Sequence, residues 1–598
     1  MTQTPSNTVP SSRFVRRIAT LLPISLVAFL SAAAQDPQPV LPNLAPREVE
    51  IRGQLVIQFP ALERQPLIGF NPPPRIPTIP TDRRPIVEEY KQSRADLPQT
   101  EISRPSPPGV LLPGAAFLNG ELEAAGGSYF DRKVRGRFGG DLSQAVSGVI
   151  KADYFGSDGQ TIDTTLAIKN PLDSFDGSAG VYARLGGLRL GSEIKGSSRS
   201  YTLYGLRPAD NPLSTSFFDN LPSRQLVGGA VGFSVDYAIP SGVATQNRVT
   251  LGLSRVATDP DSSGILNAYT LDDRRVRLSS ATSVPLGGSR LEIGLHGSFA
   301  SGSSDADNAV LSTPVSRSEF LYRGTLGVRR SGPRANLAVG AAILGTAVDD
   351  DVDSAGPKRK LSYLTPSVDL EYYPTSGLTV FARNTPEAVG TNIPDVFRDN
   401  PFLSSDVTLQ PSLKVVQADA GISLSIAPLQ VRLSGGYDWS PNWLYFDRVT
   451  RAGIAGFFEP QYAKARVYRG DVAVDADLTG SLHASVGASY QDGMLTETDT
   501  AVPYLPKWSG TGTLGYRLLE RRLLLQAEGQ YTGTRIVSVG SDVSADAVVS
   551  LNAHVLFNVT RSIGLTFSAR NILDDPLEYW QGYPGVGRQF LGGFRLLW

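Results

Sequence analysis

The sequence predicts an all-β fold: a transmembrane antiparallel β-barrel of roughly 22 strands, preceded by a proline-rich N-terminal extension. Three observations predict this fold. Apolar and polar side chains alternate with a period of two from about residue 115 onward. Many alternating runs exceed the roughly nine residues that a tilted strand needs to cross a membrane. The polar face of these runs carries charges, which suits the wall of a water-filled lumen.

The composition agrees with a barrel. The 598 residues include 60 Gly, 22 Tyr and 24 Phe but only two Met and three His, and the formal net charge is -1. A balanced charge lacks the basic excess that nucleic-acid binding requires, so we expect no nucleic-acid partner. Cys is absent, which excludes disulfides, Cys-bound zinc and thiol catalysis. We expect no cofactor.

Residues 1–34 have the pattern of a cleaved signal peptide. Three arginines precede the apolar run 18–30, and three alanines follow it before Gln35. A run of about 13 residues is too short for a transmembrane helix, which needs roughly 20. The sequence therefore predicts export, no transmembrane helix in the mature chain, and a place in the cell outer membrane.

Residues 35–113 form the proline-rich extension, which holds seventeen of the 43 prolines. Proline removes hydrogen-bond donors, so most of this segment should be irregular and lie in the periplasm or in the lumen. One amphipathic strand is predicted at 48–59. A single strand is unstable alone, so it should dock in the barrel, pair with the barrel rim or bind a partner. Its apolar face comprises Val49, Ile51, Leu55, Ile57 and Phe59.

Residues 114–598 form the predicted barrel. In RLEIGLHGSF (290–299), Leu291, Ile293 and Leu295 fall on one face, and Glu292 and His296 fall on the other. The apolar face should contact outer-membrane lipid. Aromatic residues near strand ends are typical of an interfacial girdle; the example is Tyr437, Trp439, Trp443 and Tyr445.

The C-terminal stretch GYPGVGRQFLGGFRLLW (582–598) continues the alternation, with Phe590, Phe594 and Trp598 on one face. It resembles the C-terminal signal by which the insertion machinery recognises outer-membrane barrels. Gly593, Leu596 and Trp598 fit the spacing of that signal. Leu591 departs from it, because a polar residue is usual there.

Three stretches resemble the TonB-dependent receptors. SARNILDDPLEYWQGYPGVGRQFLGGFRLLW (568–598) is similar to their closing hairpin, and segments 398–424 and 502–518 are similar to their mid-barrel strands. The likeness in the closing hairpin rests on Asn571, Leu573, Asp574, Gly582, Tyr583, Pro584, Gly587, Arg588 and Phe590. Such receptors carry an N-terminal plug domain of well over 100 residues. Only about 80 residues precede the barrel here, so the resemblance implies a receptor-like barrel without a standard plug.

Other candidate sites carry less specific patterns. His296, His483 and His554 fall on the polar faces of separate strands, without the spacing of a metal site. Four Asp within 349–353 favour a solvated loop over a calcium site. Lys133, Arg135 and Arg137 share one face and form a candidate basic patch for anionic solutes. No catalytic set of residues is present, so the sequence predicts no enzyme and no resident metal.

The sequence thus predicts an outer-membrane barrel for solute passage, or the membrane component of an envelope complex. Its gate would be the N-terminal segment or a periplasmic companion. One alternative is a TonB-energised uptake receptor with residues 48–51 as the coupling strand. The other is a structural or assembly barrel that carries no solute.

Overall fold

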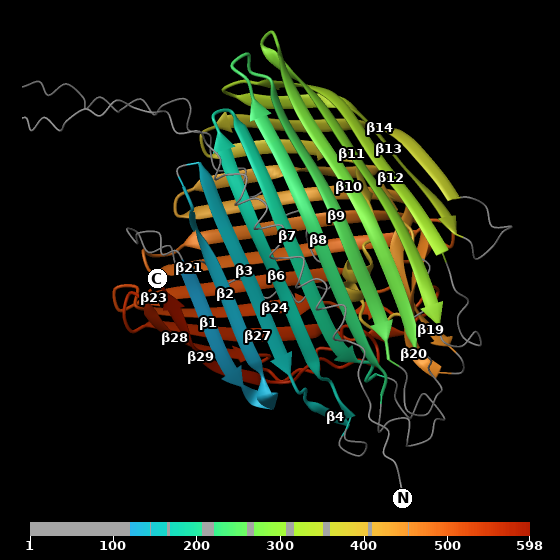
Figure 1. The fold of residues 1–598 in the computed structure, drawn as a ribbon, viewed down its shortest axis with the longest axis vertical. Helices are drawn as coiled ribbons and strands as arrows, with labels where there is room; N and C mark the ends of the chain where they lie inside the picture. Colours follow the sequence, from blue (N-terminus) through green and yellow to red (C-terminus); the bar gives the residue numbers. More distant parts are fainter. Residues whose placement is uncertain are drawn as a thin grey trace, which may run out of the picture. The chain divides into compact units, whose positions relative to one another are not determined.

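The computed structural model describes residues 120–598 except 144, 164–167, 206–220, 260–267, 307–315, 351–358, 405–408 and 452–453. The predicted signal peptide, the extension 35–113 and its strand 48–59 lie outside these residues. In the described part, each long strand pairs antiparallel with the next along the chain. The first strand, β1 (Gly120–Gly127), pairs with the last, β29 (Gln589–Leu597), so the sheet closes into a barrel of 22 strands. Figure 1 shows blue β1 beside red β29.

The first half of the barrel contains regular hairpins. Its strands after β1 are β2 (Arg132–Asp141), β3 (Val146–Ser157), β6 (Leu172–Leu185), β7 (Leu188–Thr202), β8 (Ser223–Ala238), β9 (Ala244–Thr258), β10 (Tyr269–Leu286), β11 (Ser289–Ala306), β12 (Ser316–Ser331) and β13 (Ala335–Asp350). Three short elements occupy its connections: the 3-10 turn η1 (Ser128–Phe130), β4 (Thr161–Asp163) and β5 (Ile168–Lys169).

The second half carries the longest connections. Its barrel strands are β14 (Arg359–Thr375), β15 (Leu378–Asn384), β18 (Val416–Ile426), β19 (Leu429–Arg451), β20 (Ile454–Asp477), β21 (Leu482–Leu495), β23 (Trp508–Leu518), β24 (Leu523–Thr532), β27 (Val548–Asn558), β28 (Ile563–Arg570) and β29. Among the described residues, five short strands lie in its connections: β16 (Glu387–Val389), β17 (Ser412–Lys414), β22 (Thr500–Ala501), β25 (Arg535–Ile536) and β26 (Ser544–Ala545).

The predicted alternation is confirmed. On β11, Leu295 is 60% exposed on the outer surface, while Glu292 forms an ion pair inside the barrel with Arg329 of β12. On β29, Phe590 and Phe594 are exposed, as is Trp598 directly after the strand, and Gln589 and Leu591 are buried. A continuous outer belt of apolar side chains is stable only against lipid, so the barrel spans a membrane.

Connections differ sharply between the two ends of the barrel. At one end, which also holds Gly120 and Trp598, turns of two to five residues join the strands. The two-residue turns at 186–187 and 287–288 begin with glycines in the left-handed region, as tight hairpins require. Most loops at the other end are longer. Outer-membrane barrels place short turns in the periplasm and long loops outside the cell, which orients this one.

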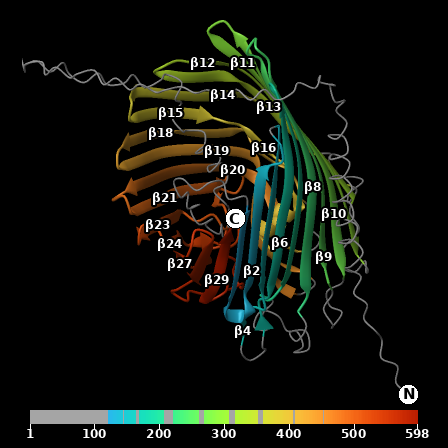
Figure 2. The same ribbon diagram turned by 60° about the vertical axis from the view of Figure 1, so that its left-hand side comes forward.

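Strands β19 and β20 extend beyond the neighbouring strands at the long-loop end; Figure 2 shows them beside β18 and β21. A bulge in β19, between Ser440 and Trp443, bends this hairpin. The sequence had suggested that Trp443 lies in a lipid-facing girdle. Instead, Trp443 is buried against Val467 and Leu495 beyond the bulge. Tyr437 does face outward, packed on Tyr468. Among the described residues, no helix has the length and apolarity to cross a membrane.

Candidate functional site

The lumen wall carries charged side chains in pairs. Lys133 of β2 contacts Glu123 of β1 at 2.6 Å, and Arg135 contacts Asp153 of β3 at 2.5 Å. Two members of the predicted basic patch are therefore neutralised by neighbouring carboxylates, and only Arg137 has no ion pair among the described residues. The patch does not present a concentrated positive charge to a solute.

A ladder of alternating charges crosses β11, β12, β14 and β15 near the short-turn end. Arg329 lies between Glu292 at 2.6 Å and Asp369 at 3.4 Å. Arg383 then joins Asp369, at 3.0 Å, to Glu371. Each charge has an opposite neighbour, so this wall is polar and hydrated but locally neutral.

At the long-loop end, six connections and the paired strands β19 and β20 contribute to one apolar cluster, here called the mouth cluster. The connections are β3–β6, β7–β8, β15–β18, β21–β23, β24–β27 and β28–β29. Because these connections leave the barrel at points spread around its circumference, the cluster spans the extracellular mouth. Its buried aromatic members are Tyr201, Tyr269, Phe397, Phe402, Phe446, Phe457, Phe458, Tyr504, Trp580 and Tyr583.

The longest connection crosses the mouth. Residues 385–415, here called the strap, run from β15 to β18 and contain β16 (Glu387–Val389), α4 (Ile393–Asp399) and β17 (Ser412–Lys414). β16 and β17 pair at the base of the strap. α4 packs against β8 and β9, which are several strands away from β15 in the ring. The strap therefore reaches across the lumen.

The sequence of the strap explains its helix. A proline occupies the first turn of α4, where its missing N–H costs nothing, together with Asp395, and Arg398 lies in the last turn. Ile393, Val396 and Phe397 fall on one face and are buried. This short helix has too few turns to be stable alone, so its apolar face must be held by the mouth cluster.

A buried ionic network anchors the first leg of the strap. The Thr391 hydroxyl donates to Glu319 of β12 at 3.1 Å, and the Thr391 carbonyl accepts from Arg275 of β10. Glu319 also pairs with Arg317, and Arg275 lies 3.5 Å from Asp273. Removing one member would leave an unmatched buried charge, which costs about 3–5 kcal/mol.

Arg224 of β8 anchors the middle of the strap. Its side chain is fully buried, and Nη1 donates to the carbonyl oxygens of Pro401 at 2.9 Å and Leu403 at 2.8 Å. The guanidinium also stacks on the Phe397 ring, with Cζ 5.1 Å from the ring centroid. On the other side of the strap, Leu403 bridges to Phe458 of β20. One arginine thus ties the strap to a distant part of the wall.

The bulge in β19 anchors the last leg. Asn442, within the bulge, accepts from the Leu413 N–H at 2.9 Å and donates to the Pro411 carbonyl at 2.6 Å. Ser412 donates to the Asn442 carbonyl at 3.0 Å. The bulge turns the Asn442 side-chain amide toward the strap, where the amide satisfies backbone groups of Leu413 and Pro411.

The loop between β28 and β29 completes the mouth cluster with Tyr583. Its ring stacks on Phe402 of the strap, with centroids 3.4 Å apart, and its hydroxyl donates to the Gly456 carbonyl at 2.9 Å. Tyr204 donates to the Pro584 carbonyl at 2.9 Å. Burial raises the pKa of both Tyr204 and Tyr583 well above the usual value of a tyrosine.

Solved structures share this architecture. The FrpB iron transporter from Neisseria meningitidis (F5-1 variant) has a TM-score of 0.63 and 11% identity over 80% of this chain and 82% of that chain. The copper transporter OprC has a TM-score of 0.61 and 15% identity over 80% of each chain. The ferric-catecholate import receptor Fiu from K12 E. coli has a TM-score of 0.58 and 12% identity over 80% of this chain and 81% of that chain. The chain forms a TonB-dependent-receptor-like outer-membrane barrel.

Identities this low establish a shared fold alone. No protein-family model matches the sequence, and a comparison with curated proteins finds no match either. The receptor-like barrel therefore has to be interpreted from its own side chains.

The closing hairpin of the receptor-like barrel brings most of its predicted residues together. Asn571 donates to the carbonyls of Asp575 at 2.7 Å and Val586 at 3.1 Å. Asp574 accepts from the Arg588 N–H at 2.8 Å and lies 3.7 Å from its guanidinium. Leu573 and Phe590 are exposed, and the Gly587 N–H donates to Gln160. These contacts hold the loop that carries Tyr583.

The residues predicted as an insertion signal lie on β29 beside β1. A Cβ on Gly593 would lie 2.2 Å from the Ala124 carbonyl oxygen, so closure of the barrel requires glycine there. Trp598 packs against Gly120 and is 54% exposed, and Leu596 pairs with Leu122. Recognition of these residues by the insertion machinery stays a prediction, as do the roles proposed for Val49, Ile51, Leu55, Ile57 and Phe59, which lie outside the described residues.

The three histidines lie apart. His554 contacts the Ser568 hydroxyl at 2.8 Å, and His483 contacts Asp477 at 3.0 Å. His296 lies on β11, on the lumen face. In the part of the chain that the structure describes, no three His, Asp or Glu side chains gather as a metal site would require.

Sequence reasoning missed the residues that hold the strap. Arg224, Thr391 and Asn442 bind backbone or side chains far away in the sequence, so no local pattern marks them. One signal was present. The resemblance of segment 398–424 to receptor strands draws attention to Pro401 and Phe402, which are at the centre of the mouth cluster.

Proposed function

We propose that this protein passes solutes across the outer membrane through the barrel lumen, and that the strap forms its outer gate. The observation that carries the proposal is the attachment of the strap to β8, β10, β12 and β19 by buried polar contacts. A connection that served only to join β15 to β18 would need no such contacts, because these strands pair directly beneath it.

The inner gate in this proposal is the segment 35–113 or a periplasmic companion. A barrel of about 22 strands encloses a lumen too wide for its own side chains to fill, and related transporters keep theirs plugged. The segment is long enough to enter the lumen, and the strand predicted at 48–59 would supply an apolar face for docking.

Planar-bilayer recordings of the purified full chain test this function. The variants are a strap deletion that joins β15 to β18 by a short Gly-Ser turn, a deletion of 35–113, and the double deletion. We expect little current from the full chain and large stable pores from the double deletion. Pores from the strap deletion alone would show that the whole gate lies at the extracellular mouth. A double deletion that folds but never conducts would refute solute passage and favour the structural alternative.

Uptake assays address the energised alternative, in which residues 48–51 contact TonB. Copper and iron species are suitable first solutes, because the matched structures include a copper transporter and iron transporters. If uptake survives without TonB while deletion of 48–59 admits antibiotics, the segment gates the lumen. If uptake requires both TonB and residues 48–51, the segment couples the barrel to energy.

A further inference from the structure

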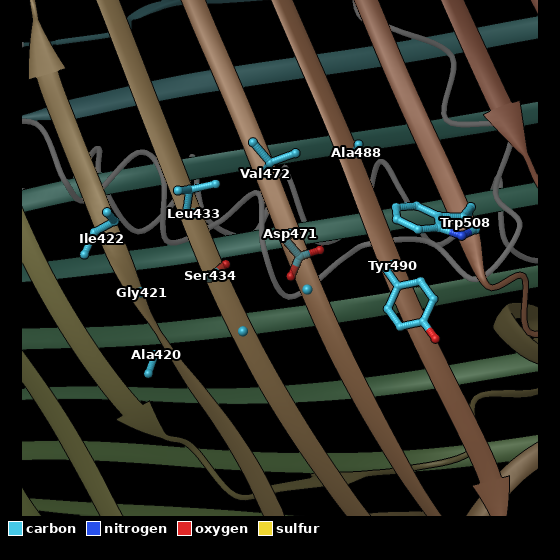
Figure 3. Close-up of a pocket in the computed structure, with 12 residues that line it drawn as sticks. Ala420, Gly421, Ile422, Leu433, Ser434, Asp471, Val472, Ala488, Tyr490 and Trp508 are labelled. Carbon is cyan, nitrogen blue, oxygen red and sulfur yellow. The ribbon is translucent and has the colours of Figure 1, made fainter.

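A groove crosses the lipid-facing surface of β18, β19 and β20. Its floor is one row of paired residues: Ala420 opposite Gly435, and Gly435 opposite Gly470. The hollow has a volume of about 480 Å³. Figure 3 shows one side of the groove, with Ile422, Leu433 and Val472 in a line, and one end of it, with Tyr490 beside Trp508.

The glycines of the floor are not explained by packing within the chain. A Cβ on Gly470 would meet no atom within 4 Å, and one on Gly435 would meet only the Arg469 carbonyl, at 3.8 Å. Neither backbone requires glycine, since neither has a positive φ. Glycine inside a strand costs about 0.5–1 kcal/mol relative to alanine. Because these positions carry no side chains, the floor of the groove is open to another molecule.

The walls limit what can enter. On the short-turn side, Ile422 and Leu433 are 42% and 45% exposed. On the long-loop side, Tyr437 and Tyr468 form the next outward-facing row, with their rings tilted by 45° and their centroids 5.1 Å apart. The two flanking rows lie about 13 Å apart between Cα atoms, and their side chains narrow this gap further. An α-helix, about 10–12 Å across, is too wide for the groove.

The depth of the groove identifies the leaflet. Tyrosine concentrates at the membrane interface, and here Tyr437 and Tyr468 border the groove on its long-loop side, which faces outside the cell. Arg466 lies two positions beyond Tyr468 on the same face of β20 and donates to the weak acceptor Met494 Sδ. Its charge has no carboxylate partner among the described residues and is available for an anionic headgroup.

We propose that the groove binds the acyl chains of an outer-leaflet glycolipid, with Arg466 near its anionic headgroup. The lining is apolar, the groove has the width of alkyl chains, and it is continuous with the lipid-facing belt. This proposal does not depend on whether the barrel carries a solute.

Native mass spectrometry of the full chain in mild detergent, titrated with purified lipopolysaccharide, tests it. Gly435→Leu/Gly470→Leu fills the floor, and we expect retention of the lipid to fall at least tenfold. The matched control is Gly512→Leu. Gly512 shares the outward face with Leu514 and also has open space at its Cβ, but it lies outside the groove; its substitution should leave retention unchanged.

Arg466→Gln provides the headgroup arm and should weaken lipopolysaccharide binding several-fold. Equal retention in the filled and control variants would refute the groove, since only annular lipid would then be bound. Equal retention of phosphatidylethanolamine and lipopolysaccharide by the unmodified chain would refute the glycolipid. If a polypeptide co-purifies with the unmodified chain but not with the Gly435→Leu/Gly470→Leu variant, the occupant of the groove is a protein and the lipid proposal is refuted.

Discussion

Arg224 shows how one side chain can hold a loop over a wide lumen. It is fully buried, and its donors reach two carbonyls of the strap and the Thr258 hydroxyl. Buried carbonyls that lose a donor retain the cost of leaving water, which makes such a residue expensive to remove.

We expect Arg224→Met to loosen the strap by about 1–3 kcal/mol, because the Pro401 and Leu403 carbonyls lose their donor while the apolar volume is kept. Amide hydrogen exchange of segment 398–404 should then be faster, with the barrel strands unchanged. The control is Arg255→Met, which removes a solvent-accessible arginine from β9. Equal protection in both variants would show that Arg224 does not anchor the strap.

The buried tyrosines predict a response to alkaline pH. In the closed mouth the pKa of Tyr204 and Tyr583 is raised by burial, whereas solvated tyrosine titrates near 10. Below pH about 10 the hydroxyls are neutral in both states, and stability of the closed mouth is unaffected. Above it the open state gains by ionising, so the closed state weakens as pH rises. Current through the 35–113 deletion should therefore increase as pH rises above about 10. Tyr204→Phe/Tyr583→Phe should flatten that rise, and an unchanged rise would contradict the assignment.

The strap and the β19–β20 hairpin act as a pair of elements. They are joined by the Leu403–Phe458 bridge and by the Asn442 bulge, and both contribute to the mouth cluster. If the strap is a gate, it must separate from this hairpin before anything can pass.

A crosslink tests that motion directly. The chain has no native cysteine, so Leu403→Cys/Phe458→Cys introduces one defined pair at positions that already bridge. Combined with the deletion of 35–113, the oxidised form should stay closed and reduction should restore current. Each single-cysteine variant serves as the control. Current that persists in the fully oxidised pair would exclude the strap as the outer gate.

The closed ring depends on the seam between β1 and β29. Gly593 lies against the β1 backbone there, whereas its neighbour Gly592 faces open space. Two adjacent glycines therefore provide a matched test of closure.

We expect Gly593→Val to block assembly, because a Cβ would lie within 2.2 Å of the Ala124 carbonyl oxygen. Gly592→Val should fold normally. Heat-modifiable migration in gel electrophoresis distinguishes folded from unfolded barrels. Normal migration of the Gly593 variant would show that the seam can adjust, and the glycine would then have to be explained by recognition during insertion.

The sequence was sufficient for the barrel because alternation is a local property. The faces of β11 and β29 follow from a period of two, the strand number follows from the count of alternating runs, and the membrane barrel follows from the length of those runs and the charges on their polar face. The strap anchors could not be predicted, since Arg224 and Pro401 are separated by 177 residues and the loops meet only after the ring has closed. The groove was also missed, because Ala420, Gly435 and Gly470 become neighbours only through strand register. The strand expected at 48–59 remains a prediction.

The paired charges of the lumen wall bear on how an opened barrel would conduct. Where each guanidinium faces a carboxylate, as in the ladder around Arg329 and Asp369, a permeating ion meets little net potential. Such a pore would sort molecules by size more than by valence. Under a potassium chloride gradient its reversal voltage would stay close to zero. Bulky neutral sugars would reduce its current as much as charged molecules of similar size.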